Sequence, residues 1–113
     1  MQLSQISETK LSPLLLDDDG LLLNPEQWTE SIAVDLAYKI GIEEMSPDHW
    51  LVVYALRDYF SKFGVAPAMN NVCRSYDKDK LWVHDLFVTC LNAWIVSGLP
   101  NPGEEAKSYL SDM

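Results

Sequence analysis

The sequence predicts an α+β chain that is mostly helical, with a short β-hairpin near the N-terminus and about five helices. Two proline-marked starts are each followed by apolar residues about every four positions, the spacing of one helix face. The hairpin is predicted by Asp19-Gly20 between two leucine runs, because Asp-Gly favours the positive φ of a tight turn. Short leucine runs can also be helical, so the turn decides this prediction.

Prolines and glycines mark most of the predicted helix ends. Asn24-Pro25 and Ser46-Pro47 are typical helix starts, because Asn and Ser cap free backbone N–H groups and proline suits the first turn. Gly41 and Gly64 are expected to end the helices that follow. The expected elements are a loose tail over 1–13, strands at 14–16 and 21–23, helices over 25–41 and 46–63, a short helix from Ala66-Pro67, a loop over 76–80, a buried helix over 81–96 and a last helix over 104–110.

Length, charge and hydropathy exclude several classes of function. The 113 residues, 48% of them hydrophobic, suit one domain with one core. A net charge of −9 with eight scattered basic residues disfavours nucleic acid and anionic membranes as partners. No apolar run is long enough to span a membrane, and the N-terminus lacks a signal-peptide pattern, so a cytoplasmic protein is expected.

The polar candidates for chemistry have structural interpretations. Cys73 and Cys90 lack metal-ligand spacing with the histidines and are expected to be reduced thiols in the core. We expect neither a metal nor a cofactor, and we interpret the acidic run over 17–19 as a solvated turn. His49 is expected to bond local backbone at its helix start, since no nucleophile is identified beside it. Trp28, Trp50 and Tyr54 are expected in the core.

The stretch Gly98-Leu99-Pro100-Asn101-Pro102 predicts an extended arm that projects from a helical body, because proline fixes φ and lacks an N–H. Four other ordered blocks precede it: 19–24 with Trp28, 41–42 with 46–50, 56–60 with 63–67, and 86–87. Together, from about Leu14 to Pro102, these blocks resemble the DsrC/TusE family of sulfur-relay proteins, which are like the gamma subunit of dissimilatory sulfite reductase. The resemblance implies a hairpin or small meander packed on helices, a domain over 14–102, and an atypical acidic extension over 103–113.

The resemblance also implies a chemistry that this chain departs from. In the family, a cysteine on the arm accepts sulfur as a persulfide, and some members carry a second cysteine just before the arm. Counting from Pro102 and Gly98 places those positions at Glu105 and Trp94. Neither side chain supplies a thiolate, the form of sulfur that acts as the nucleophile. The family's arm and the groove where it docks correspond to residues 98–102 and Arg57, which are therefore expected to bind partners.

Two functions follow from these residues. The first is a non-catalytic interaction or regulatory protein, which binds sulfur-relay or sulfite-reductase-type proteins without holding a persulfide. The second is an active sulfurtransferase that uses Cys90 or Cys73 as a relocated thiol. Glu104 and Glu105 either mimic a charged, unreactive arm end or stabilise the N-terminus of the last helix.

Overall fold

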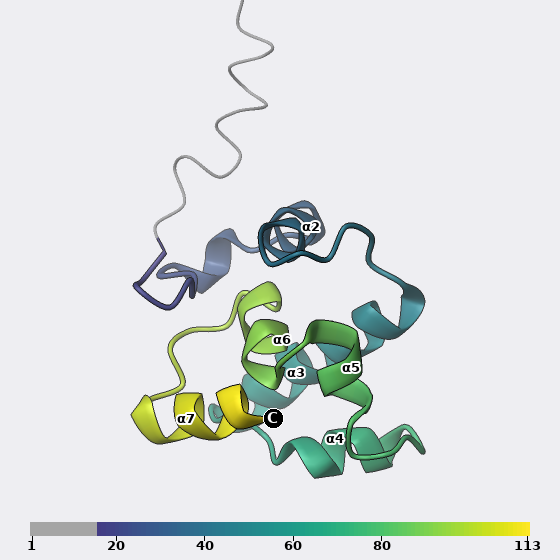
Figure 1. Ribbon diagram of the computed structural model, residues 1–113. Helices are drawn as coiled ribbons and strands as arrows, with labels where there is room; N and C mark the ends of the chain where they lie inside the picture. The colour runs from purple at the N-terminus through teal and green to yellow at the C-terminus, as the bar shows by residue number, and fades with distance from the viewer. Residues whose placement is uncertain (1–15) are drawn as a thin grey trace, which may run out of the picture.

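Helix α6 (Cys90–Val96) lies at the centre of the structure, a computed structural model that describes residues 16–113 (Figure 1). It packs against α2, α3, α5 and α7, and five of its seven residues are buried. The other elements are a 3-10 turn η1 (Pro25–Gln27) and the helices α2 (Glu30–Lys39), α3 (Pro47–Phe63), α4 (Met69–Ser75), α5 (Trp82–Phe87) and α7 (Glu104–Asp112). The described part of the chain is therefore mostly helical, as predicted.

Helix α3 begins and ends at the residues that the sequence predicted. The Ser46 side chain accepts the His49 N–H, and His49 Nδ1 accepts the Ser46 N–H at 3.0 Å, which together form a capping box. His49 Nε2 therefore carries the ring proton and donates it to the Leu86 carbonyl at 2.8 Å. Gly64 ends the helix with a left-handed φ of 70°. The structural interpretation of His49 is confirmed.

The helix predicted from Pro25 to Gly41 is interrupted at Trp28. Pro25–Gln27 forms only a 3-10 turn, the Asn24 side chain makes no capping bond, and Trp28 has an extended backbone with ψ 137°. Thr29 caps the helix instead, since its side chain accepts the Ile32 N–H. The break directs the Trp28 indole towards α6, where its Nε1 donates to the Val96 carbonyl at 2.9 Å.

The single helix predicted over 81–96 is in fact two helices. Val88 separates them with a φ of 75°, and Thr89 starts α6 by accepting the Asn92 N–H at 3.1 Å. The Asn92 side chain in turn donates to the Phe87 carbonyl at the end of α5. Likewise α4 begins at Met69, two residues after the predicted Pro67 start.

The predicted hairpin is not supported in the described part of the chain. Residues 16–113 contain no strand, and one antiparallel bridge joins Leu16 to Leu22. The turn between them forms, because Asp17 Oδ1 accepts the N–H groups of Asp19 and Leu21. Pro25 starts the 3-10 turn soon afterwards, and proline cannot donate to a ladder. The rest of the first strand, 14–15, and the expected tail over 1–13 lie outside the described residues.

The expected aromatic core is also partly wrong. Trp28 and Trp50 are half-buried, and Tyr54 is 44% exposed. Trp94 and Phe87 are the large aromatic residues that the core encloses completely. Trp50 and Tyr54 lie on α3 and Trp28 precedes α2, and the centre of the Tyr54 ring is 6.0 Å from that of Trp28 and 6.2 Å from that of Trp50.

Candidate functional site

The arm lies against the body, and the expectation that it projects is wrong. Leu99 is buried with 4% of its surface exposed. The Pro100 carbonyl accepts a hydrogen bond from Trp94 Nε1 at 2.8 Å. Asn101 is exposed, and its side chain donates to Asp17 at 3.4 Å. The first half of the arm is thus part of the core, because removing the apolar Leu99 side chain from water lowers the free energy of the folded state.

Arg57 and Trp28 fix the base of the arm. Arg57 Nη1 donates to the Ser97 carbonyl at 2.7 Å, and its guanidinium lies 3.9 Å from the centre of the Trp28 ring. Burial lowers the pKa of Arg57. Gly98 passes the same indole so closely that a Cβ there would lie 2.1 Å from Trp28 Cδ1. Arg57, expected to bind partners, makes its polar contact inside the molecule.

Trp94 occupies the position at which the resemblance places the second cysteine. Its side chain is fully buried, and Phe60 contacts it edge-on at 5.8 Å between ring centres. Its one polar atom is satisfied by the Pro100 carbonyl. In this chain, residue 94 is therefore a buried aromatic residue that contacts the arm.

Glu105 occupies the position at which the resemblance places the sulfur-accepting cysteine. It is exposed in the first turn of α7, beside the equally exposed Glu104. Both residues line a cavity of about 500 Å³ between the arm and the end of α3. Acidic side chains are favourable in the first turn of a helix, where the free N–H groups carry partial positive charge. The carboxylate stabilises this turn and offers no sulfur nucleophile.

Helix α7 ties the arm to the N-terminal acidic turn. Lys107 Nζ lies 2.7 Å from an Asp19 carboxylate oxygen and 3.0 Å from one of Glu104. These bonds raise the pKa of Lys107 above its ordinary value. The run over 17–19 is therefore not simply solvated, because Asp17 holds the arm and Asp19 holds α7.

The outer end of α7 is anchored to the body. Leu110 is fully buried, and the Tyr109 hydroxyl accepts the Met69 N–H at 2.9 Å at the start of α4. His84 Nδ1 donates to the Met113 carbonyl at 2.6 Å. The arm at one end of this segment and the C-terminal end of α7 at the other are consequently both bound to the body.

Neither thiol is available in this conformation. Cys73 is 1% and Cys90 3% exposed, and both are free. Burial raises the pKa of Cys90 to about 11, so almost none of it is thiolate near neutral pH. Cys73 Sγ makes a weak contact with the Lys80 carbonyl at 3.8 Å. Their expected place in the core is confirmed.

No cation site is evident in residues 16–113. No three His, Cys, Asp or Glu side chains in this range are placed to hold a metal. Nor is any helix of the described residues long and apolar enough to cross a bilayer.

Trp94 and Glu105 were selected as candidates from the sequence, which did not indicate the residues that restrain the arm. Trp28 was expected only as a core residue, and Asp17, Asp19 and Lys107 had no site role. The sequence offered one signal for these contacts, the opposite charges of the acidic run over 17–19 and of Lys107. Such pairs of opposite charges are common by chance in a chain with 17 acidic residues.

A comparison with protein-family models assigns the chain to a family. The model described as "DsrC like protein" matches residues 8–104. This chain belongs to the DsrC family. The match ends at the first residue of α7, so nearly all of that helix lies beyond it.

The chain is similar to relatives with two different names. "Sulfurtransferase TusE" of Shigella dysenteriae is 33% identical over 95 residues, which cover 76% of this chain and 86% of the relative. The dissimilatory-type sulfite reductase subunit gamma of Nitratidesulfovibrio vulgaris is 30% identical over 89 residues, which cover 77% and 85%.

Solved structures agree with this placement. The oxidized gamma subunit DsrC from Archaeoglobus fulgidus superposes with a TM-score of 0.72 at 32% identity, over 80% of this chain and 90% of that one. The DsrC gamma subunit from Pyrobaculum aerophilum gives 0.71 at 33% identity, over 80% and 85%. The helical arrangement described above is therefore the DsrC fold.

Proposed function

We propose that this DsrC-family chain is a protein-binding, regulatory member of a sulfur-relay or sulfite-reductase-type system that carries no persulfide on its arm. The observation that carries the proposal is the exposed Glu105 at the acceptor position, in the first turn of α7. A carboxylate cannot take the terminal sulfur of a persulfide, whereas a thiolate can. The position of the second family cysteine offers no thiol either, because Trp94 occupies it and is fully buried.

The proposed partners follow from the named relatives. One relative is a sulfurtransferase and another is a subunit of a sulfite reductase. Asn101 in the arm and Glu105 in the first turn of α7 are exposed, so a partner of either kind can contact them. A chain that binds there without accepting sulfur would compete with a thiol-bearing relative. The proposal places it in the cytoplasm and includes no nucleic acid or membrane partner.

The proposed domain organisation treats residues 103–113 as an acidic extension of a family domain over 14–102, after a tail over 1–13. The family match, which covers residues 8–104 and so begins within the proposed tail, supports the separation of the C-terminal extension alone. In the proposal, α7 fixes the segment after the arm to the body through Leu110 and Lys107.

The alternative, a sulfurtransferase that uses Cys90 or Cys73, requires one of these thiols to become exposed and ionised. A persulfide donor distinguishes the two functions. The protein is incubated with glutathione persulfide, whose outer sulfur is transferred to an attacking thiolate with release of glutathione thiolate, and its intact mass is measured. The proposal expects no added sulfur in the wild-type protein.

Two variants complete this experiment. Cys90→Ser and Cys73→Ser each remove one candidate thiol, and each should leave the wild-type mass result unchanged. Stable addition of one sulfur to the native protein, lost in either variant, would contradict the proposal and establish a relocated acceptor.

A further inference from the structure

Apolar residues form much of the lining of the cavity beside the arm. This cavity of about 500 Å³ lies between the end of α3, Trp94 of α6, and residues 101–106 at the end of the arm and the start of α7. We call it the arm cavity. Val65 in its lining is 57% exposed, so part of this apolar surface faces water. The apolar residues of the lining besides Trp94 are Phe60, Val65, Ala66, Pro102 and Ala106.

The charged residues that line the arm cavity are acidic. Glu104 and Glu105 belong to the lining, which includes no Lys, Arg or His among the residues that the structure describes. Lys107 offsets the charge of Glu104, at 3.0 Å between Nζ and a carboxylate oxygen. Glu105 has no ion-pair partner within residues 16–113. One carboxylate beside apolar surface is therefore left without a counter-charge.

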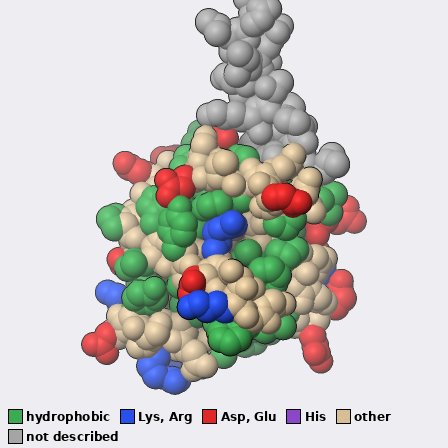
Figure 2. Space-filling model, turned by 180° about the vertical axis from the view of Figure 1, so that it is seen from behind, with side chains coloured by type: hydrophobic (Ala, Val, Ile, Leu, Met, Phe, Trp, Pro, Cys, Tyr) green, Lys and Arg blue, Asp and Glu red, His purple; other side chains and the backbone are tan. Residues whose placement is uncertain are grey.

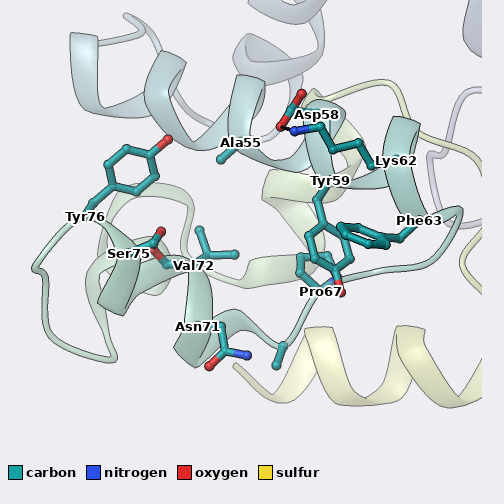
Figure 3. A pocket seen from close by; sticks show the side chains of 11 residues that line it. Ala55, Asp58, Tyr59, Lys62, Phe63, Pro67, Asn71, Val72, Ser75 and Tyr76 are labelled. Carbon is teal, nitrogen blue, oxygen red and sulfur yellow. Dashed lines mark hydrogen bonds and ion pairs between the residues drawn. The ribbon is translucent and has the colours of Figure 1, made fainter.

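Other hollows of the surface have their charges balanced. In the cavity between α3 and α4, Asp58 and Lys62 point toward each other and form an ion pair at 3.2 Å (Figure 3). Lys107 lines a further cavity together with Asp19 and Glu104, which it contacts. Basic side chains also lie among hydrophobic ones near the centre of the face that Figure 2 shows. The unbalanced carboxylate is therefore a local property of the arm cavity, and does not follow from the net charge of −9 alone.

The end of α3 adds to the negative potential of the arm cavity. Phe60 and Gly64 line it, and the Gly64 N–H donates to the Phe60 carbonyl at 2.8 Å. The C-terminal end of a helix carries partial negative charge on its last carbonyls, which favours cations. The start of α7 carries the opposite partial charge, which the carboxylates of Glu104 and Glu105 outweigh. The helix end and the free carboxylate thus both favour a cationic group.

We infer that the arm cavity binds an arginine side chain of a protein partner, whose methylene groups contact the apolar lining and whose guanidinium pairs with Glu105. The charge of the cavity selects such a group by complementarity. Arginine suits the site better than lysine, because a planar guanidinium binds a carboxylate through two hydrogen bonds and stacks on aromatic rings such as the half-buried Phe60. A second copy of this chain is disfavoured, since two molecules of charge −9 repel each other.

This inference rests on the proposed function in one respect, the existence of a protein partner, and it names the side chain by which that partner is recognised. The two fail separately. Sulfur loading tests whether the chain holds a persulfide, whereas peptide binding tests the cavity, so either result can be negative while the other stands.

Four probes test the arm cavity. They are a tripeptide of arginine between two leucines, with both ends capped, the same tripeptide with citrulline or with lysine at its centre, and free arginine. Citrulline has nearly the shape of arginine but no charge. Binding to the ¹⁵N-labelled protein is followed by amide chemical shifts. We expect the arginine tripeptide to bind at least tenfold tighter than its citrulline form and several-fold tighter than the other two probes, with shifts confined to residues 60–66 and 101–107.

Matched variants locate the binding. Glu105→Gln removes the free charge while it keeps the shape of the side chain, and it should weaken binding of the arginine tripeptide at least fivefold. Val65→Ser changes an exposed apolar residue of the lining and should weaken binding at least twofold. Glu43→Gln and Leu23→Ser are the controls, because both residues are exposed and lie outside the lining, and both should leave the affinity unchanged.

Several results would overturn the inference. They are no binding of the arginine tripeptide, equal binding of the citrulline or lysine form, and unchanged affinity in Glu105→Gln. Equal binding of free arginine would show a site for a small cation in place of a protein segment. Self-association of the protein that the arginine tripeptide blocks would make a second copy of the chain the occupant.

Discussion

At Gly98 the backbone adopts a φ of 68° directly against the Trp28 indole. Gly98→Ala should lower the free energy of unfolding by about 2–4 kcal/mol, from overpacking and positive-φ strain together. Gly41→Ala is the control, since Gly41 has a φ of 97° but nothing within 4 Å, and it should cost only about 1 kcal/mol. Urea denaturation measures both. Equal losses would contradict the close contact at the base of the arm.

The two positions at which the resemblance places cysteines, 94 and 105, should differ in their tolerance of cysteine. Trp94→Cys empties a fully buried site and leaves the Pro100 carbonyl without its donor, so it should cost about 3–5 kcal/mol. Glu105→Cys changes an exposed side chain and should alter stability by about 0.5 kcal/mol at most. Thermal or urea unfolding tests the pair. A tolerated Trp94→Cys would show that this indole does not hold the arm.

The junction of α5 and α6 depends on a β-branched residue in an unfavourable conformation. Val88 is 61% exposed and has a φ of 75°, which glycine adopts without strain. Val88→Gly should therefore stabilise the protein by about 1 kcal/mol. An increase in the urea midpoint at constant m-value would support this junction, whereas a decrease would indicate that the helix continues through residue 88.

Helix α7 should hold the arm through Leu110. Leu110→Ala removes its fully buried anchor and should cost about 2–4 kcal/mol or detach the helix. Detachment should also accelerate amide exchange at Gly103, which donates to the Asn101 side chain. Exposed Ser108→Ala is the control and should leave exchange at Gly103 unchanged. Fast exchange at Gly103 in the wild-type protein would contradict a restrained arm.

Capping residues in the sequence predicted those helix ends that depend only on contacts between neighbouring residues. Ser46 with Pro47, and Gly64, marked α3 correctly because capping and left-handed termination involve only neighbouring residues. The breaks at Trp28 and Val88 were missed. Trp28 leaves the helix to reach the Val96 carbonyl 68 residues away, and no local pattern contains that partner.

Across the whole molecule, the family resemblance selected candidate positions, while packing determines which contacts their side chains make. Positions 94 and 105 followed from counting along the arm, but the enclosure of Trp94 by Phe60 requires tertiary structure. The N-terminal acidic turn was similarly visible in the sequence, whereas its ion pair with Lys107 spans 88 residues.

A single side-chain replacement should convert this chain into a sulfur carrier. Glu105→Cys places an exposed thiol in the first turn of α7, where the helix N-terminus lowers a cysteine pKa. The decisive measurement is the intact mass of this variant and of the wild-type protein after exposure to glutathione persulfide. We expect one added sulfur on the variant, assigned by peptide mapping to the substituted position, and none on the wild type. Equal loading of the wild-type protein would contradict the proposal that this chain lacks a sulfur acceptor.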